Sequence, residues 1–373
     1  MTNQKARGFT LIEIMVALAI GALLLAGITQ VFISLKQTDK VSSALSRVQE
    51  AGRTAMGIMA YDFRMIGYKG CADPAITENI NIIAANPPTT DFISTSLRGS
   101  DISATGWSSA TTPVDFTDLS DIDGTGARKA RLDSDIISIM RASDDTATVD
   151  EHDNNNSNVK VEGNPLNLSQ GDVAILADCE SMDIFRISNV TTSGGSSEVT
   201  FAHGMGSGVN TNNKLSKAYT DPNAKMMSFL SNTYFVGETG RKNVNGDTIY
   251  ALFRRDISGN IQEIVEGVED LQVTYGYEFV NGNRRFVDAS TAAATLGAGG
   301  IELKMSQVTS IKFSILVASD DRVLDASDAA VYPMSGAKAE PASSGGSLTY
   351  PDDHRLRKVF TMTVNLRNRR VSI

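Results

Sequence analysis

The stretch KARGFTLIEIMVALAIGALLLAG, residues 5–27, decides the fold of this 373-residue chain. Residues 14–28 carry no polar side chain, and the mostly apolar run extends over 9–35. As a helix, a run of that length measures roughly 40 Å, which is ample for crossing a bilayer. The polar leader before it carries Lys5 and Arg7, and such positive charge stays on the cytoplasmic side of a membrane. The sequence therefore predicts a membrane-spanning helix over 9–35, with the rest of the chain exported.

Two residues set this run apart from an ordinary secretory signal. Such a signal has a short apolar core that is followed by a cleavage site of small residues. Here a small residue, Gly8, comes before the run, so cleavage at that point would leave the whole helix on the mature chain. Glu13 lies inside the run, where a carboxylate costs a few kcal/mol and is tolerated when it pairs with a cation. We therefore expect Glu13 to have a functional role.

The residues RGFTLIEIMVALAI resemble the class III signal of type IV prepilins, and a plain signal anchor is the alternative. In that family a membrane-embedded prepilin peptidase cuts after the glycine and methylates the new terminal phenylalanine. The matching positions are Gly8, Phe9 and Glu13, without departure from the family pattern. The resemblance implies a leader over 1–8, cleavage after Gly8 and N-methylation of Phe9. It also implies that Glu13 is an assembly contact, paired with the free terminal amine of a neighbouring subunit's helix.

A second helical pattern follows the apolar run. Apolar and small residues recur at spacings of three and four over 36–70, with charged residues between them, which is typical of an amphipathic helix. The pattern predicts one long helix that continues from the membrane segment and ends near Gly67 or Gly70. A coiled-coil dimer is the weaker alternative, because the stripe is poor in leucine. The stripe consists of Val41, Leu45, Val48, Gly52, Ala55, Met59, Phe63 and Ile66.

Beyond Gly70 the apolar period changes to two, which is typical of half-buried strands. The clearest strands are LQVTYGYEF (271–279), SIKFSILV (310–317) and RLRKVFTMTVNLRNR (355–369). The predicted fold class is α+β, with the long N-terminal helix packed on a β-rich, mainly antiparallel head over 71–373. A division of the head into two lobes near 205–230 stays open. Further strands are expected at 135–141, 172–178, 183–190, 197–203, 233–238 and 248–256, and polar loops at 94–130, 144–169, 191–197, 204–224, 289–300 and 334–354.

The last of these strands has one apolar face and one face rich in arginine. Because charged strand faces are commonly exposed, we expect Arg355, Arg357, Arg367 and Arg369 to lie on a solvated sheet face. Contact with DNA or with a partner protein is the alternative. The formal net charge of −9 argues against non-specific nucleic-acid binding by the whole chain, although it leaves a local basic patch open.

Four segments of the head resemble the PilW-type minor pilins: GYKGCAD (67–73), LADCESMDIFRI (176–187), VEGVEDLQVTYGYE (265–278) and RKVFTMTVNLRNR (357–369). The resemblance implies a non-enzymatic structural subunit that primes assembly of a type IV pilus and is located at its tip. Before assembly it would be a single-pass protein of the bacterial inner membrane with its head in the periplasm, and afterwards part of the extracellular pilus. The expected partners are the prepilin peptidase, other minor pilins and the major pilin, with a tip adhesin as an open addition.

Two rival functions remain beside this one. A type II secretion pseudopilin shares the leader and the helix, and a tip module that adheres to surfaces or captures DNA need not exclude a role in assembly. A head of about 300 residues is too bulky to repeat at the close spacing of helices in a fibre, which favours a place at one end.

The chain has two cysteines, Cys71 and Cys179. In a reducing cytosol they would be two unlinked thiols, whereas export to an oxidising compartment predicts a disulfide between them. We find no residue set for catalysis and expect neither a cofactor nor a metal. His152, in an Asn- and Asp-rich stretch expected to be a loop, is interpreted as solvated or structural, as are His203 and His354. The segment DIDGTG (121–126) is interpreted as a turn, because Leu132 takes the place of the glutamate that ends a calcium loop.

Overall fold

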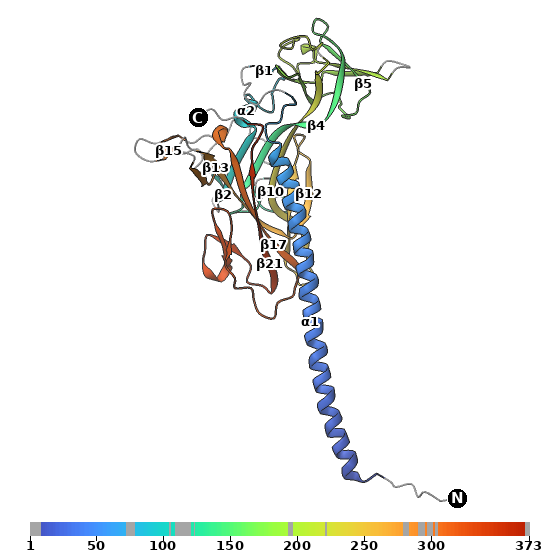
Figure 1. Ribbon diagram of the computed structural model, residues 1–373, viewed down its shortest axis with the longest axis vertical. Helices are drawn as coiled ribbons and strands as arrows, with labels where there is room; N and C mark the ends of the chain where they lie inside the picture. Colours follow the sequence, from blue (N-terminus) through green and yellow to red (C-terminus); the bar gives the residue numbers. More distant parts are fainter. Residues whose placement is uncertain are drawn as a thin grey trace, which may run out of the picture.

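The computed structural model shows a long helix that projects from a β-rich head, with the N-terminus at the free end of the helix (Figure 1). It describes residues 9–71, 79–103, 106–108, 121–122, 124–192, 197–220, 222–278, 283–289, 295–296, 301–302 and 305–369. The predicted leader 1–8, including Gly8, lies outside these residues, and so does Phe279 of the expected strand 271–279.

Helix α1, Leu11–Arg64, is continuous over 54 residues and joins the predicted membrane segment to the amphipathic segment. Thr10 caps its N-terminus, and its last turn ends at Arg64, three residues before Gly67. Gly67 and Gly70 have φ angles of +73° and +76°, a backbone conformation that glycine adopts without a steric penalty. These glycines stop the helix and turn the chain into the head, as the sequence predicts.

The head is built around one large sheet, in which β10, Lys225–Lys242, and β4, Ile136–Asp153, are the longest strands at 18 residues each. They pair antiparallel along most of their length, from Lys225 beside Thr148 to Tyr234 beside Ile137. The other strands of this sheet are β1 (Ile80–Ile82), β2 (Leu97–Ser103), β3 (Gly106–Ser108), β5 (Asn158–Glu162), β6 (Val173–Ala177), β7 (Met182–Arg186), β8 (Asn189–Thr192), β9 (Glu198–Ala202), β11 (Thr248–Arg255) and β12 (Ile261–Glu266).

A second sheet has the order β14-β13-β17-β21 and is antiparallel throughout. Its strands are β14 (Arg284–Val287), β13 (Val268–Glu278), β17 (Ser310–Arg322) and β21 (Arg355–Asn365). Small elements complete the described chain: α2 (Phe92–Thr95), β15 (Thr295–Leu296), β16 (Ile301–Glu302), β18 (Tyr332–Pro333), β19 (Lys338–Pro341), β20 (Leu348–Tyr350), and the 3₁₀ turns η2 (Met205–Ser207), η3 (Met305–Gln307) and η4 (Ala342–Ser344). The fold is therefore α+β and mainly antiparallel, which confirms the predicted class.

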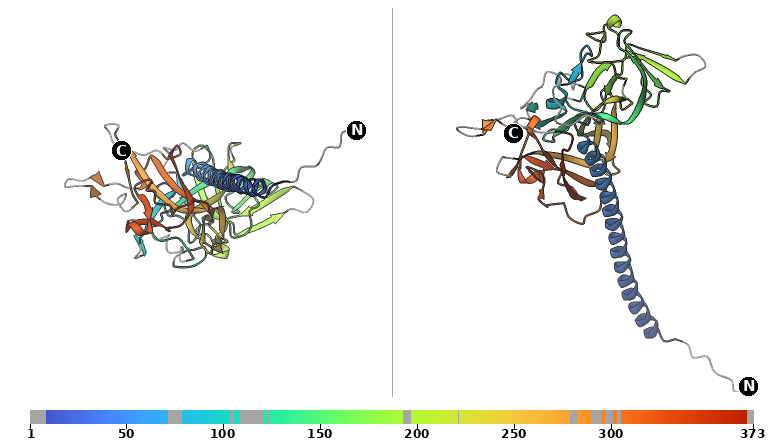
Figure 2. Two further views of the ribbon diagram at one scale, coloured as in Figure 1. Left: turned by 90° about the horizontal axis from the view of Figure 1, so that it is seen from below. Right: turned by 45° about the horizontal axis from the view of Figure 1, so that its top comes forward.

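The main core lies between the two sheets, and α1 closes it along one flank of the head (Figures 1 and 2). The apolar stripe of α1 contributes Val48, Ala55, Met59 and Phe63, all of them buried. A separate apolar cluster, called here the apex cluster, lies at the end of the head away from the N-terminus of α1. It is formed by Ala147, Val149, Val159, Val161, Leu168, Ala174, Leu176, Phe185, Ile187, Val199, Phe201, Leu215, Tyr219, Ala224, Met226 and Ile83.

The prediction of a loop over 144–169 is wrong for much of that range. Strand β4 continues to Asp153, and β5 pairs with it antiparallel after a turn over 154–157. The segment is polar because only alternate side chains, such as Ala147 and Val149, enter the apex cluster. A strand with one solvated face needs few apolar residues, so its composition looked like that of a loop.

Candidate functional site

The first part of α1, up to Lys36, is exposed along nearly its whole length. Every residue from Phe9 to Lys36 is exposed except Gly21, which is partly exposed, and Phe9 itself is 85% exposed. By length and composition, this helix is long and apolar enough to cross a membrane. In water such an apolar surface would carry a large hydrophobic cost, so it requires a bilayer or other apolar helices around it.

Glu13 has an intrachain role that the sequence reasoning missed. Its carboxylate accepts hydrogen bonds from the backbone N–H of Thr10 at 2.8 Å and from the Thr10 hydroxyl at 2.9 Å. In return, the Glu13 N–H donates to the Thr10 hydroxyl oxygen at 3.4 Å. Together these bonds form a capping box, and the sequence signal for it is the T-x-x-E spacing in TLIE. The Glu13 side chain is thereby held against Thr10 at the very start of α1.

The second half of α1 is fixed to the head by a buried carboxylate. Asp62 is 4% exposed and forms an ion pair with Arg141 of β4 at 3.0 Å. The same carboxylate accepts hydrogen bonds from the Asn232 amide at 2.8 Å and the Tyr234 hydroxyl at 2.6 Å, both on β10. One side chain thus joins α1 to the two longest strands of the head. The sequence signal that could have predicted this joint is an aspartate within the apolar stripe MAYDFRMI, because a buried carboxylate needs polar partners.

Close packing supports this joint from the other sheet. A Cβ atom at Gly52 would overlap the ring of Phe360 on β21, so only glycine allows α1 to approach that strand. Phe63 packs edge-on against Phe313 of β17, with ring centroids 5.0 Å apart. It also packs against Tyr234 at 5.9 Å. The head and the second half of α1 therefore form one packed unit, from which the apolar first half projects.

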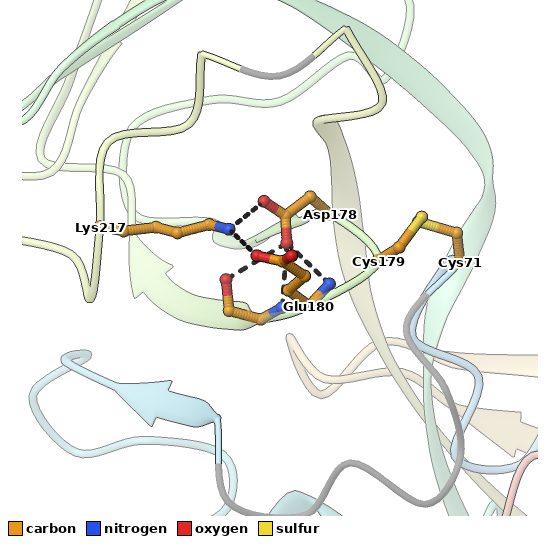
Figure 3. The surroundings of a disulfide bond; sticks show 6 residues. Cys71, Asp178, Cys179, Glu180 and Lys217 are labelled. Carbon is orange, nitrogen blue, oxygen red and sulfur yellow. Dashed lines mark hydrogen bonds and ion pairs between the residues drawn. A yellow bond between two sulfur atoms is a disulfide. The ribbon is translucent and has the colours of Figure 1, made fainter.

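A disulfide joins Cys71, just beyond the end of α1, to Cys179 in the turn between β6 and β7 (Figure 3). The two Cα atoms are 4.8 Å apart, although 108 residues separate them in sequence. Lys217 forms ion pairs with the residues on either side of Cys179, at 2.5 Å to Asp178 and 3.2 Å to Glu180. The pairing is the one that export of the head predicts, and it ties the region of the apex cluster to the end of the helix.

Removal of this disulfide is expected to lower the free energy of unfolding by about 2–4 kcal/mol, because the unfolded chain regains the freedom of a long loop. Denaturation of the full-length protein in detergent, for wild type and for the Cys71→Ser/Cys179→Ser double variant, measures the difference. Reductant should destabilise the wild type and leave the double variant unchanged. Two free, alkylatable thiols in protein isolated from cells would contradict the pairing.

The prediction of a solvated arginine face over 355–369 is wrong for three of its four arginines, of which Arg355 and Arg357 lie on β21 and Arg369 lies beyond its end. Arg355, Arg357 and Arg369 are 2%, 5% and 6% exposed, whereas Arg367 is exposed. Glu269 of β13, itself fully buried, pairs with Arg355 and with Arg357, each at 2.7 Å. Arg357 also binds the Asp353 carboxylate through two N–H groups, at 2.7 and 2.9 Å.

For Arg355 and Arg357 the cause lies in the chain between β17 and β21, which folds back over this face of the second sheet. Arg369 instead donates hydrogen bonds to the backbone carbonyls of Ile93 and Met305. Tyr350 of β20 lies under the Arg357 guanidinium, with the ring centroid 4.5 Å away. Leu316, Met334, Ala339, Leu348 and Tyr350 form a further apolar cluster there. Alternation along β21 predicted two different faces correctly, but it could not show that the segment before the strand folds over the charged face.

Two histidines far apart in sequence meet in the apex cluster. His152, on β4 rather than in the expected loop, and His203, just after β9, are 5% and 0% exposed, and their Nε2 atoms lie 3.3 Å apart. The backbone N–H of Tyr219 donates to His152 Nδ1 at 2.9 Å. His152 therefore carries its proton on Nε2 and donates it to His203. Both are structural, in agreement with that interpretation, while His354 is partly exposed and bonds the Leu324 carbonyl at 2.9 Å.

This pair predicts acid sensitivity. Burial, reinforced by the His152 ring, lowers the pKa of His203 to about 4. Between about pH 6.5, the pKa of an unfolded histidine, and pH 4, the unfolded chain binds a proton that the folded chain does not. His203 should thus remove about 3 kcal/mol of stability as the pH falls through that window. Unfolding of wild type and His203→Phe, compared at pH 7 and pH 4, tests this: the variant should lose less stability on acidification. An equal loss in both would contradict the prediction.

The described residues hold no cluster of three or more His, Cys, Asp or Glu side chains placed to bind a metal ion. Asp121, the first residue of the expected turn DIDGTG, pairs with Arg255 at 2.6 Å, and Asp123 lies outside the described residues. The features that point to a function are therefore the projecting apolar helix, its capped start and its joint with the head.

Two family models match the chain, one near its N-terminus and one in its C-terminal part. Residues 3–29 match the prokaryotic N-terminal methylation motif, which covers the leader and the start of α1. Residues 233–368 match the type IV pilus-assembly protein W family. These two matches support a type IV pilin of the PilW type. Comparison with curated proteins and with solved structures finds no match.

The PilW match covers a particular part of the pilin. It begins within β10 and includes β11, β12 and the whole second sheet, and among these elements β12, β17 and β21 pack on α1. The chain over 154–224, which surrounds the apex cluster, falls outside it. Pilins and the PilW family are structural components of pili. The leader motif and the apolar helix fit a membrane-anchored pilin, and they indicate processing by a peptidase and interaction with other pilins.

Proposed function

We propose that this pilin is a minor pilin that primes assembly of the type IV pilus and is located at its tip. The observation that carries the proposal is the division of α1: one half is exposed and apolar, and the other is fixed within a large head. The apolar half can leave a bilayer for a bundle of like helices at little cost, because both environments are apolar. The head, with its own sheets and clusters, is too bulky to repeat at helix spacing.

The proposal includes the processing and assembly residues. Cleavage after Gly8 would place the new amine on Phe9, next to the carboxylate that the capping box fixes at Glu13. In a bundle, the Glu13 carboxylate of one helix would then neutralise the amine of its neighbour. The proposed chain order is a leader (1–8), a membrane and assembly helix (9–35), an amphipathic segment (36–70) and the head (71–373), with two lobes divided near 205–230.

Processing gives a direct prediction. Mature protein should begin at N-methylated Phe9, and Gly8→Leu should retain the leader, because the peptidase would meet a bulky residue at its cleavage position. Intact-mass measurement of protein purified from membranes distinguishes the two forms. The conservative variant Gly8→Ala is the control and should be cleaved at least in part. A mature N-terminus beyond residue 30 would show that the segment is an ordinary signal peptide.

Deletion and imaging test the function itself. Loss of the protein should reduce the number of surface pili, and restored expression should bring them back. Gold labelling of a tag inserted at the exposed 3₁₀ turn η2 should mark one end of each pilus rather than its length. Lost secretion of enzymes with unchanged pili would instead identify a pseudopilin. Normal pili that fail only in adhesion or DNA uptake would identify a tip-binding module.

A further inference from the structure

The lower rim of the head approaches α1 almost where the apolar run ends. The rim, called here the base, consists of the turn 243–247 between β10 and β11 and of residues 320–324, which form the end of β17 and the chain just beyond it. The side-chain amide of Gln37 donates a hydrogen bond to the carbonyl oxygen of Val323 at 2.6 Å. Gln37 lies two residues beyond Leu35, the last residue of the apolar run. At about 1.5 Å per residue, the base therefore begins about 3 Å along the axis from that run.

The charges on α1 fix the level of the membrane against this contact. Residues 14–35 carry no charged side chain, and they lie between Glu13 and Lys36. As a helix these 22 residues span about 33 Å, close to the hydrocarbon thickness of about 30 Å. If Glu13 lies at one boundary of the hydrocarbon layer, Lys36 therefore lies at the opposite boundary. The Val323 carbonyl then falls within the headgroup layer, which is about 5–8 Å deep on each side.

The base is rigid and presents an apolar tip. Asn243 holds the turn by accepting hydrogen bonds from the N–H groups of Asn245 and Asp247, each at 2.9 Å, and by donating to the Asp320 carbonyl at 2.7 Å. Arg322 pairs with Asp247 at 2.5 Å, which joins the turn to β17. Val244 at the tip is 89% exposed, more than any other large apolar side chain of the described head.

A hollow of about 630 Å³ separates the base from α1. Its wall on α1 includes Lys40 and Arg47, and its wall on β17 includes Asp320 and Asp321, all four of them exposed. Of these four, Lys40, Asp320 and Asp321 lie close to the level of the headgroups, and charges of both signs there suit headgroups that carry both a phosphate and an ammonium. We propose that the base is a second membrane contact, which lies among phospholipid headgroups while α1 spans the bilayer. The contact requires a membrane-spanning α1 and does not depend on a role in priming or at the tip.

A label at Val244 tests this in the full-length protein. Both native cysteines are in the disulfide, so Val244→Cys provides a single thiol for a bimane fluorophore. The matched control is Met205→Cys in η2, which is 48% exposed and lies at the opposite end of the head (Figure 2). Each labelled protein is placed in nanodiscs, at one copy per disc, with phosphocholine lipids that carry a nitroxide on the headgroup.

The nitroxide should quench bimane at position 244 several-fold more strongly than at position 205. A second variant, Gln37→Ala in the Val244→Cys chain, should weaken the quenching, because it releases the base from α1. Equal quenching at positions 244 and 205 would overturn the proposal. So would quenching at position 244 that appears only with two copies per disc, since the base would then face another copy of the chain.

Discussion

Replacing Glu13 by glutamine is expected to leave the protein in the membrane and to abolish its entry into pili. Glutamine serves in a capping box as glutamate does, so the bonds to Thr10 and the start of α1 should persist. The loss is confined to the negative charge that would neutralise the amine of a neighbouring helix. An unpaired charge among apolar helices costs several kcal/mol, enough to exclude the subunit. The measurement compares the protein in membrane and sheared-pilus fractions, together with the number of pili.

Companion variants separate the charge from the cap. Thr10→Val removes the capping hydroxyl and keeps the carboxylate, so it should weaken the helix start by about 0.5–2 kcal/mol and still enter pili. Glu13→Asp keeps the charge with a shorter reach and should be partly defective. Glu13→Val loses both the charge and the cap and should fail as the glutamine variant does. Wild-type incorporation of the glutamine variant would show that the charge has no role in assembly.

Glu269→Ala should lower the free energy of unfolding by about 3–5 kcal/mol. The carboxylate is fully buried and pairs with both Arg355 and Arg357. Its removal leaves two buried guanidinium groups short of a counter-charge, and the cost of keeping those cations out of water is then uncompensated. The segment between β17 and β21 should detach first, because Arg357 anchors it through Asp353. Denaturation of the full-length protein, with limited proteolysis at 323–354, measures both effects.

The same substitution further along β13 provides the control. Glu278 pairs with Arg284 at 3.1 Å, and both side chains are substantially exposed. Glu278→Ala should therefore change stability by about 0.5 kcal/mol or less, since water screens an exposed pair. Similar losses for the two variants would show that burial does not decide the strength of the Glu269 network.

Periodicity predicted much of this fold from local sequence. The spacing of Val48, Ala55 and Phe63 identified the packed face of α1, and positive-φ glycines ended the helix near the expected place. Strands such as β13 and β17 followed from alternation, because each pattern is contained in one short segment. The capping box between Thr10 and Glu13 was equally local, and the T-x-x-E spacing could have identified it.

Contacts between distant segments could not be obtained in this way. His152 and His203 are 51 residues apart, and nothing in either neighbourhood indicates that their rings meet. The partners of Arg357 come from β13 and from the chain before β21, so the strand's own pattern predicted exposure where the fold gives burial. Asp62 was predictable only in part. A carboxylate in an apolar stripe must have buried partners, but the sequence around Asp62 does not indicate which residues they are.

The two long strands determine how the head would bear tension. The chain over 154–224 is connected to the rest of the protein through β4 at one end and β10 at the other, with the Cys71–Cys179 disulfide as a third covalent connection. A strand already rises about 3.3–3.4 Å per residue, against a maximum of about 3.6 Å for the backbone. A pull on the apex along α1 therefore meets almost no slack, and the backbones of β4 and β10 carry it to the level of Asp62. The head should behave as an inextensible tether that passes load to the helix without unfolding first.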